Sequence, residues 1–207
     1  MKDIIDQLKW RYAVKKFDSS KKLTEEQLNK LKSALNLTAS SLGLQPYKIM
    51  IISDEETKKK LFPHAYNQAQ VITASHIFLF CAIQTIDDQF ADNYIQYAAK
   101  VHGVEVEILA DYANMVKGFV SGYDEQQKLN WASKQAYIAL GNLLTTCALE
   151  EIDSCPMEGF IVPEFSKVLG LEAKGLLPLV MCPVGYRSEE DQAQHRKKVR
   201  KTDLFDI

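Results

Sequence analysis

Residues 155–160 have the sequence Cys-Pro-Met-Glu-Gly-Phe, and this stretch carries the most information about the fold. It follows a short predicted strand at 152–155, and its proline and glycine predict a turn directly after that strand. Two motifs accompany it, Arg-Tyr-Ala-Val-Lys-Lys-Phe-Asp at 11–18 and Arg-Lys-Lys-Val-Arg at 196–200. Each motif alone is an ordinary turn or a pair of surface cations, but three of them in this order are hard to match by chance.

Around this stretch, three longer segments of almost continuous apolar character predict strands at 47–53, 76–83 and 176–184. Continuous rather than alternating apolar residues indicate strands that are covered on both faces. Mainly helical patterns fill the long interval between the second and third of these strands. The chain therefore predicts an α+β fold with a sheet packed between helices.

Helical patterns dominate the rest of the chain. Residues 3–10 predict a short helix, and a second helix begins after Thr24, which forms a capping box with Gln27. The strongest helix, at 128–150, is apolar nearly all round, so we expect it both at the centre of the fold and in a dimer interface. Because no linker or repeat divides the chain, we expect residues 1–207 to form one domain.

The composition limits the possible partners. With 25 Lys and Arg against 27 Asp and Glu, the net charge of -2 gives no bias toward nucleic acid or anionic membranes. No stretch approaches the roughly 18 apolar residues of a membrane span, and the N-terminus has no apolar signal region. We therefore expect a cytoplasmic protein without membrane or nucleic-acid partners.

The cysteines and histidines predict no metal site. The cysteines lie in apolar surroundings without a CxxC pair, which predicts buried, reduced thiols; they are Cys81, Cys147, Cys155 and Cys182. The histidines are far apart and form no HExxH motif, so a metal enzyme is not expected.

The three motifs occur together with Ser-Ser-Leu-Gly-Leu-Gln-Pro-Tyr at 40–47 and Trp-Ala-Ser-Lys-Gln at 131–135. In this combination and order the chain resembles the FMN-dependent nitroreductases over almost its full length. The resemblance implies a three-layer α/β/α fold with a central, mainly antiparallel sheet flanked by helices. It also implies an intertwined homodimer with FMN sites in the interface.

The resemblance implies a role for each motif. FMN carries a phosphate dianion and, when reduced, a negative charge at N1/O2 of the ring, so cations are needed at two places. Arg11, Lys198 and Arg200 would hold the phosphate, and Lys15 would reach the N1/O2 edge. The implied cofactor-binding set is Arg11, Tyr12, Ala13, Lys15, Ser40, Ser41, Gly43, Asn67, Gln70, Pro156, Met157, Glu158, Gly159, Lys198 and Arg200.

Within that set, the turn at 156–159 would lie against the ring, with a backbone N–H near Glu158 and Gly159 donating to flavin N5. No catalytic side chain is required. Glu158 could be considered as a general acid or base, but the resemblance assigns the role to the backbone around it. The serines at 40–41 would belong to the site of the other subunit, and Asn67 would face the pyrimidine side. The implied substrate channel is lined by Ser41, Leu42 and Phe119.

Some residues depart from the family pattern. Ala13 stands where relatives often have a serine, Gln70 where they have a second lysine, and Gly43 where they have an asparagine. The resemblance therefore implies fewer polar contacts and one positive charge less around the reduced ring.

The leading hypothesis is an FMN-dependent NAD(P)H oxidoreductase that reduces nitroaromatics, quinones or similar acceptors by two electrons in a ping-pong cycle. NADH or NADPH would be a transient co-substrate, in agreement with the lack of a GxGxxG fingerprint. Alternatives are a specific pteridine or free-flavin reductase of the same fold, and a non-enzymatic helical interaction protein. A nucleic-acid binder that uses the basic cluster at 195–201 is a further alternative, disfavoured by the near-neutral charge and the lack of interleaved aromatics.

Overall fold

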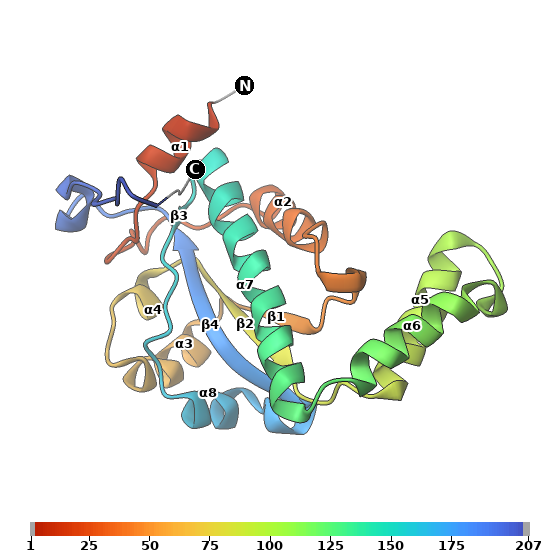
Figure 1. Ribbon diagram of the computed structural model, residues 1–207. Coiled ribbons are helices and arrows are strands. Elements are labelled where there is room, and N and C mark those ends of the chain that lie inside the picture. The colour runs from red at the N-terminus through yellow and green to blue at the C-terminus, as the bar shows by residue number, and fades with distance from the viewer. Residues whose placement is uncertain (1–2, 205–207) are drawn as a thin grey trace.

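A computed structural model describes residues 3–204, and Figure 1 shows its helices and strands. The sheet has the strand order β1-β2-β4-β3, and all neighbouring strands are antiparallel. The strands are β1 Tyr47–Ile52, β2 His76–Ile83, β3 Asp153–Ser154 and β4 Leu176–Gly185. All four strand predictions are confirmed, with boundaries that differ by no more than one residue at each end.

Helices cover both faces of this sheet. The α-helices are α1 Ile4–Trp10, α2 Glu25–Asn36, α3 Glu55–Leu61, α4 Gln70–Thr73, α5 Asp88–His102, α6 Ala110–Ser121, α7 Glu125–Leu149 and α8 Val162–Leu169. Short 3-10 helices are η1 Ser41–Gly43, η2 Pro63–Ala65, η3 Val106–Leu109, η4 Glu172–Lys174 and η5 Gln192–His195. The predicted capping box at the start of α2 is present, since the Thr24 hydroxyl and the Gln27 side chain each accept from the other's backbone N–H.

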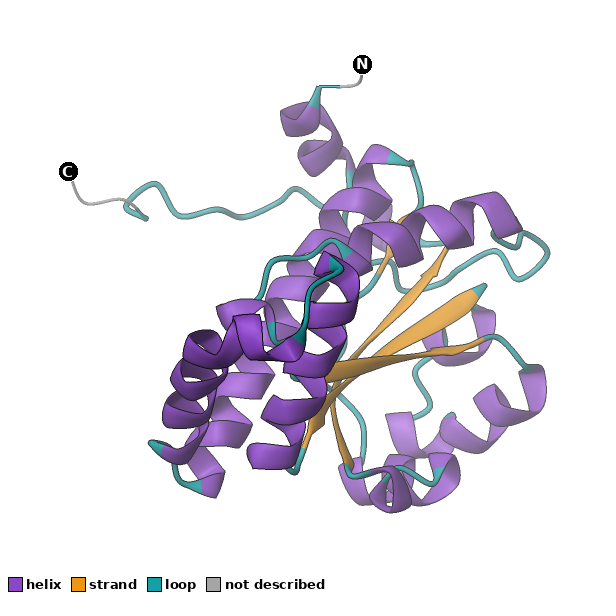
Figure 2. Cartoon of the chain, turned by 90° about the vertical axis from the view of Figure 1, so that its right-hand side faces the viewer, coloured by secondary structure: helices purple, strands orange, loops and turns teal. Residues whose placement is uncertain are grey.

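The three-layer arrangement follows from the period of two along β2. Phe78 and Phe80 pack with α2 and α7 on one face, whereas Ile77 and Leu79 pack with α3, α4 and α8 on the other. Figure 2 shows the strands lying between these two layers of helices. The α/β/α fold predicted from the resemblance is therefore confirmed. The extent of the domain, 1–207, stays a prediction, and its ends at 1–2 and 205–207 lie outside the described residues.

Helix α7 crosses the centre of the fold, as predicted (Figure 1). It begins three residues earlier than the predicted start at 128, because Asp124 and Gln127 form a capping box ahead of the apolar segment. Part of its surface is open within this chain, since Ile138 is 50% exposed and Tyr137 is 39% exposed. A partner that covers this side of α7 remains a prediction.

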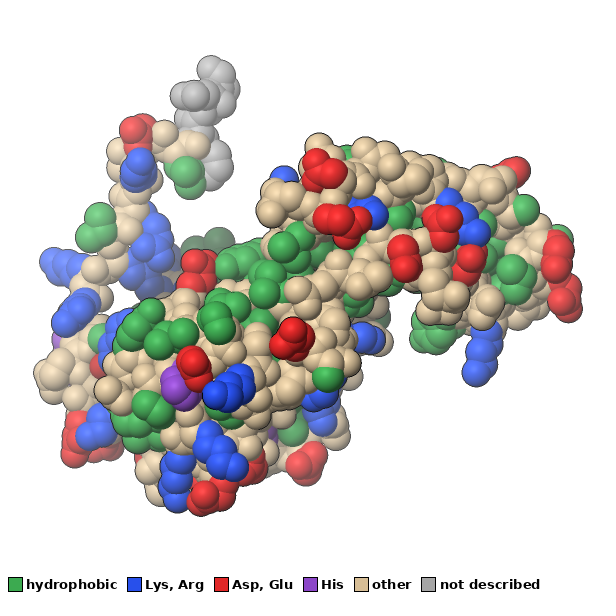
Figure 3. Space-filling view, turned by 90° about the horizontal axis from the view of Figure 1, so that it is seen from below, with side chains coloured by type: hydrophobic (Ala, Val, Ile, Leu, Met, Phe, Trp, Pro, Cys, Tyr) green, Lys and Arg blue, Asp and Glu red, His purple; other side chains and the backbone are tan. Residues whose placement is uncertain are grey.

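Helices α5 and α6 form an arm that extends away from the sheet (Figure 1). They pack against each other through buried residues that include Ala91, Val116 and Val120. Large apolar side chains are exposed on the arm; they are Tyr97, Val101, Val104, Val106, Ile108 and Met115. Hydrophobic side chains are visible on the arm and on the adjoining body in Figure 3. Exposed apolar surface of this kind is typical of protein contact regions.

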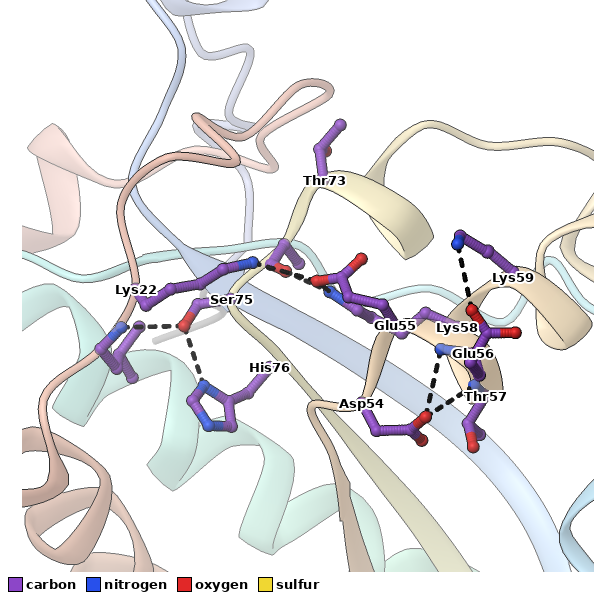
Figure 4. Close-up of polar contacts among 12 residues, drawn as sticks. Lys22, Asp54, Glu55, Glu56, Thr57, Lys58, Lys59, Thr73, Ser75 and His76 are labelled. Atoms are coloured by element: carbon purple, nitrogen blue, oxygen red, sulfur yellow. Dashed lines mark hydrogen bonds and ion pairs between the residues drawn. The ribbon is translucent and has the colours of Figure 1, made fainter.

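A buried polar cluster fixes the end of the sheet (Figure 4). The Lys58 side chain is fully buried, donates to the carbonyl of Ala74 at 3.0 Å and pairs with Glu55 at 3.0 Å. The neighbouring Ser75 hydroxyl accepts from the Leu23 N–H at 2.8 Å and contacts His76 Nδ1 at 2.9 Å. These contacts connect α3, the end of α4 and the segment before α2, which indicates a structural role for His76.

The four cysteines are free and buried, as predicted. Within residues 3–204, no helix has the length and apolar character needed to cross a bilayer. Across the same part of the chain, no group of three or more His, Cys, Asp or Glu side chains is arranged to hold a metal ion.

Candidate functional site

The N-terminal motif and the 155–160 stretch lie side by side. Ala13 forms a parallel bridge with Ser154, and Phe17 forms an antiparallel bridge with Arg187, directly after β4. The N–H of Cys155 donates to Pro183 at 3.0 Å and that of Met157 to Met181 at 2.8 Å, so the 155–157 segment continues along β4 beyond β3. Sheet pairing thus brings together two motifs that are about 140 residues apart in the sequence.

The 155–160 stretch then turns at Gly159. The Phe160 N–H donates to the Glu158 carbonyl at 2.8 Å, which closes a three-residue turn. Because the peptide bond is trans, the Gly159 N–H points away from the direction of that carbonyl. Among the hydrogen bonds of residues 3–204, neither the Glu158 N–H nor the Gly159 N–H is a donor. The turn therefore presents backbone donors that are available to a ligand.

The predicted phosphate cations form a cluster. Arg11 Nε is buried and has no hydrogen-bond partner among the described residues. Lys198 Nζ donates to two backbone carbonyls at the end of α1, both at 2.6 Å. Burial lowers the pKa of Lys198, and the positive charges of Arg11 and Arg200 lower it further. Within residues 3–204 these three cations form no ion pair with a carboxylate, so the cluster is suited to an anion.

Asp191 fixes the backbone of the N-terminal motif that carries Arg11 and Lys15. Its side chain is only 3% exposed and accepts from the Lys15 N–H at 2.8 Å and the Tyr12 hydroxyl at 3.1 Å. Its other oxygen accepts from Ala193 N–H at 3.0 Å. Burial alone would raise the pKa of Asp191, but these hydrogen bonds outweigh burial and lower it. The Lys15 side chain stays exposed and is left available to a ligand.

Arg187 supports the same region from behind. Its guanidinium holds the buried Asp153 carboxylate through Nε at 2.9 Å and Nη2 at 2.6 Å. It also lies over the ring of Trp10 at 4.2 Å and over that of Tyr12 at 4.6 Å. A planar guanidinium can make both kinds of contact at once, so Arg187 ties the end of β4 to β3 and to the N-terminal motif.

A second group of predicted residues surrounds η1. The Ser41 N–H donates to Gln135 Oε1 of α7 at 2.8 Å, and the Leu42 carbonyl accepts from the Tyr112 hydroxyl of α6 at 2.6 Å. Gly43 has a φ of +67°, and a Cβ atom there would lie 2.8 Å from Tyr94 Oη. The hydroxyl of Ser40 accepts from the backbone N–H at position 45 at 3.0 Å. The η1 loop is thereby held between α7 and the arm.

Helix α7 separates the two groups. Its Gln135 contacts Ser41, whereas its Tyr137 donates to the Glu158 carboxylate at 2.6 Å. Residues two positions apart on an α-helix point about 200° apart, so these contacts lie on opposite sides of α7. Figure 1 agrees, with the segment after β3 on one side of α7 and the loop after α2 on the other. One chain does not bring the full predicted set together.

Most of the chain matches a known protein family. Residues 8–186 match the model of the Nitroreductase family. This chain belongs to the nitroreductase family. A relative from Staphylococcus haemolyticus, named provisionally as an NAD(P)H nitroreductase, is 35% identical over 202 residues and is matched over 94% of this chain and 93% of its own. A relative from Staphylococcus saprophyticus with the same provisional name is 33% identical over 207 residues, with 96% and 93% covered.

Solved structures of other proteins share the fold. One from Exiguobacterium sibiricum, provisionally named a nitroreductase and solved in complex with FMN, has a TM-score of 0.84 at 20% identity, covering 100% of this chain and 98% of its own. The enone reductase CLA-ER, of gut-bacterial fatty acid saturation, has a TM-score of 0.81 at 20% identity, covering 98% and 95%. The nitroreductase fold is therefore established for this chain.

Within this nitroreductase fold, the first group gathers around the turn at 156–159. Gln70 is only 4% exposed, and its amide lies 3.9 Å from Cys155 Sγ, so its side chain faces this segment. Asn67 is exposed and has a φ of 54°.

The residues predicted to line the substrate channel lie near η1 and the arm. Phe119 belongs with Leu42 to the apolar cluster of the arm and packs edge-on against Trp131 at 5.2 Å between ring centroids.

Sequence reasoning missed several residues that shape this site. They are Gln68, Tyr137, Asp153, Arg187 and Asp191. A usable signal existed for Asp153, an acidic residue inside an otherwise apolar predicted strand, because buried carboxylates require partners. Gln68, Arg187 and Asp191 stand among other polar residues, and Tyr137 lies on α7, whose sequence pattern is dominated by apolar residues.

Proposed function

We propose that this protein is an FMN-dependent NAD(P)H oxidoreductase. The observation that carries the proposal is the juxtaposition of free backbone donors at Glu158 and Gly159 with a cation cluster that has no carboxylate partner in the described chain and in which Arg11 Nε has no hydrogen-bond partner. The provisional names of the relatives point to NAD(P)H, and the complex of the Exiguobacterium sibiricum protein points to FMN.

The residues present fit the phosphate of FMN. The buried Arg11 Nε lacks a partner, and a phosphate oxygen is a suitable acceptor for it. Lys198 and Arg200 add positive charge beside it. Burial and the neighbouring positive charges lower the pKa of Lys198, and no carboxylate of the described chain offsets them. A phosphate dianion would supply that compensation.

The turn at Gly159 fits the ring. Its available N–H groups would donate to the N5 position, and the exposed ammonium of Lys15 would lie toward the edge that becomes negative on reduction. Bound FMN supplies the redox chemistry itself, accepting a hydride from NAD(P)H and passing two electrons to a second acceptor. The chain's own residues bind and orient the cofactor and need not include a general base.

A homodimer would complete the site. Because the η1 loop and the Gly159 turn lie on opposite sides of α7, the loop at 40–43 would contribute to the site of the partner chain. The exposed Tyr137 and Ile138 on α7 and the apolar residues of the arm offer surface for such a partner.

Hybrid dimers test this arrangement. Arg11→Ala and Ser41→Asp homodimers should each have little activity, because both sites in each dimer carry a defect. Mixing the two variants after unfolding and refolding should restore activity, since the hybrid contains one site with both native residues. If each site were built from one chain, the hybrid would contain no intact site and activity would not return.

The acceptor would be a flat, unsaturated molecule such as a nitroaromatic or a quinone. Leu42 and Phe119 are partly buried members of one apolar cluster, and Phe119 packs on the buried Trp131, so aromatic side chains lie close to the η1 loop. A pteridine or free flavin is also flat, and a specific reductase of that kind is the alternative. Initial rates with graded NAD(P)H and quinone should give parallel double-reciprocal lines, the pattern of a ping-pong cycle; FMN-loaded protein without turnover on any of these acceptors would refute the proposal.

A further inference from the structure

The turn at Gly159 is held by a residue outside the motifs. Gln68, in the loop between η2 and α4, donates from Nε2 to the Gly159 carbonyl at 2.9 Å. The same amide nitrogen donates to the Ala65 carbonyl at 3.1 Å. The backbone N–H of Gln68 also donates to Ala65 at 3.1 Å, so both ends of this side chain are fixed to η2.

This contact adds a second restraint to the turn that carries the free donor. Two peptide planes flank Gly159. The plane before it, formed by the Glu158 carbonyl and the Gly159 N–H, is fixed by the hydrogen bond from the Phe160 N–H to that carbonyl. Gln68 fixes the one after it through the Gly159 carbonyl. With both planes fixed, the φ and ψ angles of Gly159 have little freedom, and its N–H is held on the side opposite to the Glu158 carbonyl. A glycine without this restraint would sample many conformations.

The surrounding backbone is shaped to allow this approach. Tyr66 and Asn67, directly before Gln68, have φ values of 53° and 54° in the left-handed region, which is costly for Tyr66 and tolerated by Asn67. A Cβ atom at position 159 would lie 3.0 Å from Gln68 Nε2, so a larger residue there would push the Gln68 amide away by a few tenths of an ångström. The left-handed backbone at Tyr66 thus lies directly before the residue that bonds to Gly159, and backbone strain of this kind is common at functional sites.

We propose that Gln68 is a positioning residue, which aims the Gly159 N–H at the N5 atom of the flavin and thereby favours the oxidised over the reduced cofactor. The inference rests on the proposed function. Oxidised N5 accepts a hydrogen bond, whereas in the reduced flavin that atom carries hydrogen, so a fixed N–H donor there stabilises mainly the oxidised form.

A purely structural role for Gln68 gives a different result. If Gln68 only fastened the η2 loop to the 155–160 stretch, its loss would weaken oxidised and reduced FMN binding equally. The reduction potential of the bound flavin would then stay unchanged, because it depends on the ratio of the two affinities.

The test compares Gln68→Leu with the wild-type protein, each reconstituted with FMN. The dissociation constant for oxidised FMN should rise about tenfold, the usual effect of one hydrogen bond, and that for reduced FMN should stay within about twofold. The midpoint potential should then become more positive by about 30 mV, the two-electron equivalent of tenfold. Gln89→Leu is a matched control, because it removes an exposed amide hydrogen bond to Asn93 of 2.9 Å on the arm.

Gln68→Glu provides a second readout. A protonated carboxyl can donate to the Gly159 carbonyl and an ionised one cannot, so the potential of this variant, compared with the wild type at the same pH, should approach the wild-type value as the pH falls below the ordinary glutamate pKa of about 4.3 and should differ from it at pH 8. Urea unfolding of each apoprotein separates loss of folding from loss of positioning. Wild-type protein that binds no FMN would overturn the proposed function, whereas FMN-binding protein whose potential is unchanged in folded Gln68→Leu would overturn this inference alone.

Discussion

Replacing Asp191 by alanine should release the N-terminal motif, which carries Arg11 and Lys15. The buried carboxylate accepts from Lys15 N–H at 2.8 Å, from Tyr12 hydroxyl at 3.1 Å and from Ala193 N–H at 3.0 Å. A hydrogen bond to a charged group contributes about 1.5–3 kcal/mol, but these share one acceptor group, so we expect a loss of about 3 kcal/mol rather than the sum. For a chain of this size the melting temperature should fall by about 6–12 °C.

Two assays follow this change. Urea unfolding at pH 7.5 should show a lower midpoint with the same slope, since the change removes contacts without altering the surface exposed on unfolding. FMN titration should show an affinity about tenfold weaker, because the backbone around Lys15 is no longer fixed. Glu190→Ala is the matched control, as this neighbouring carboxylate is exposed and pairs only with Lys16 in the described chain. A variant at Asp191 with unchanged midpoint and FMN affinity would refute the reasoning.

The pH dependence gives a further check on Asp191. Its pKa is lower in the folded than in the unfolded protein, so its contribution to stability is fully present above the unfolded pKa of about 3.9. That contribution is lost as the pH falls through the folded pKa, because protonation then occurs in both states. The stability difference between wild type and Asp191→Ala should therefore be constant from pH 6 to 8 and should narrow in strong acid.

Other predictions address single contacts. Lys198→Met should weaken FMN binding about tenfold but leave riboflavin binding unchanged, because riboflavin lacks the phosphate. Burial and the charge of the nearby Lys58 lower the pKa of His76, so wild-type stability should fall as the pH drops below about 6.5, and His76→Gln should abolish that component of the slope. Burial and the hydrogen bond to Glu158 raise the pKa of Tyr137 to about 12; in Glu158→Gln, an ultraviolet titration should place it closer to 10, with FMN affinity unchanged.

Local signals in the sequence predicted most of the fold. The apolar run at 76–83 predicted β2 because no polar residue interrupts it between a turn and a helix cap. The start of α7 was placed too late, because the capping box of Asp124 and Gln127 precedes the apolar segment that predicted the helix. That the 11–18 motif lies beside the 155–160 stretch could be predicted only from the resemblance, since this arrangement depends on the pairing of Ala13 with Ser154.

The supporting residues of the site could not be predicted in this way. Asp191 contacts Lys15 across 176 positions in the sequence, and such a contact depends on how the end of β4 meets the N-terminal segment. Gln68 is one polar residue in a polar loop, and its contact with Gly159 arises from the left-handed backbone at Tyr66 and Asn67. Neither kind of contact leaves a periodic pattern that a single sequence reveals.

The most direct test of the central claim is the visible absorption spectrum of the purified protein, reconstituted with FMN and then mixed with NADH or NADPH without oxygen. We expect a flavin band near ~450 nm that stays with the protein on gel filtration and bleaches on addition of one of the nucleotides. Protein that retains no flavin after reconstitution, or whose bound flavin stays oxidised with both nucleotides, would contradict it.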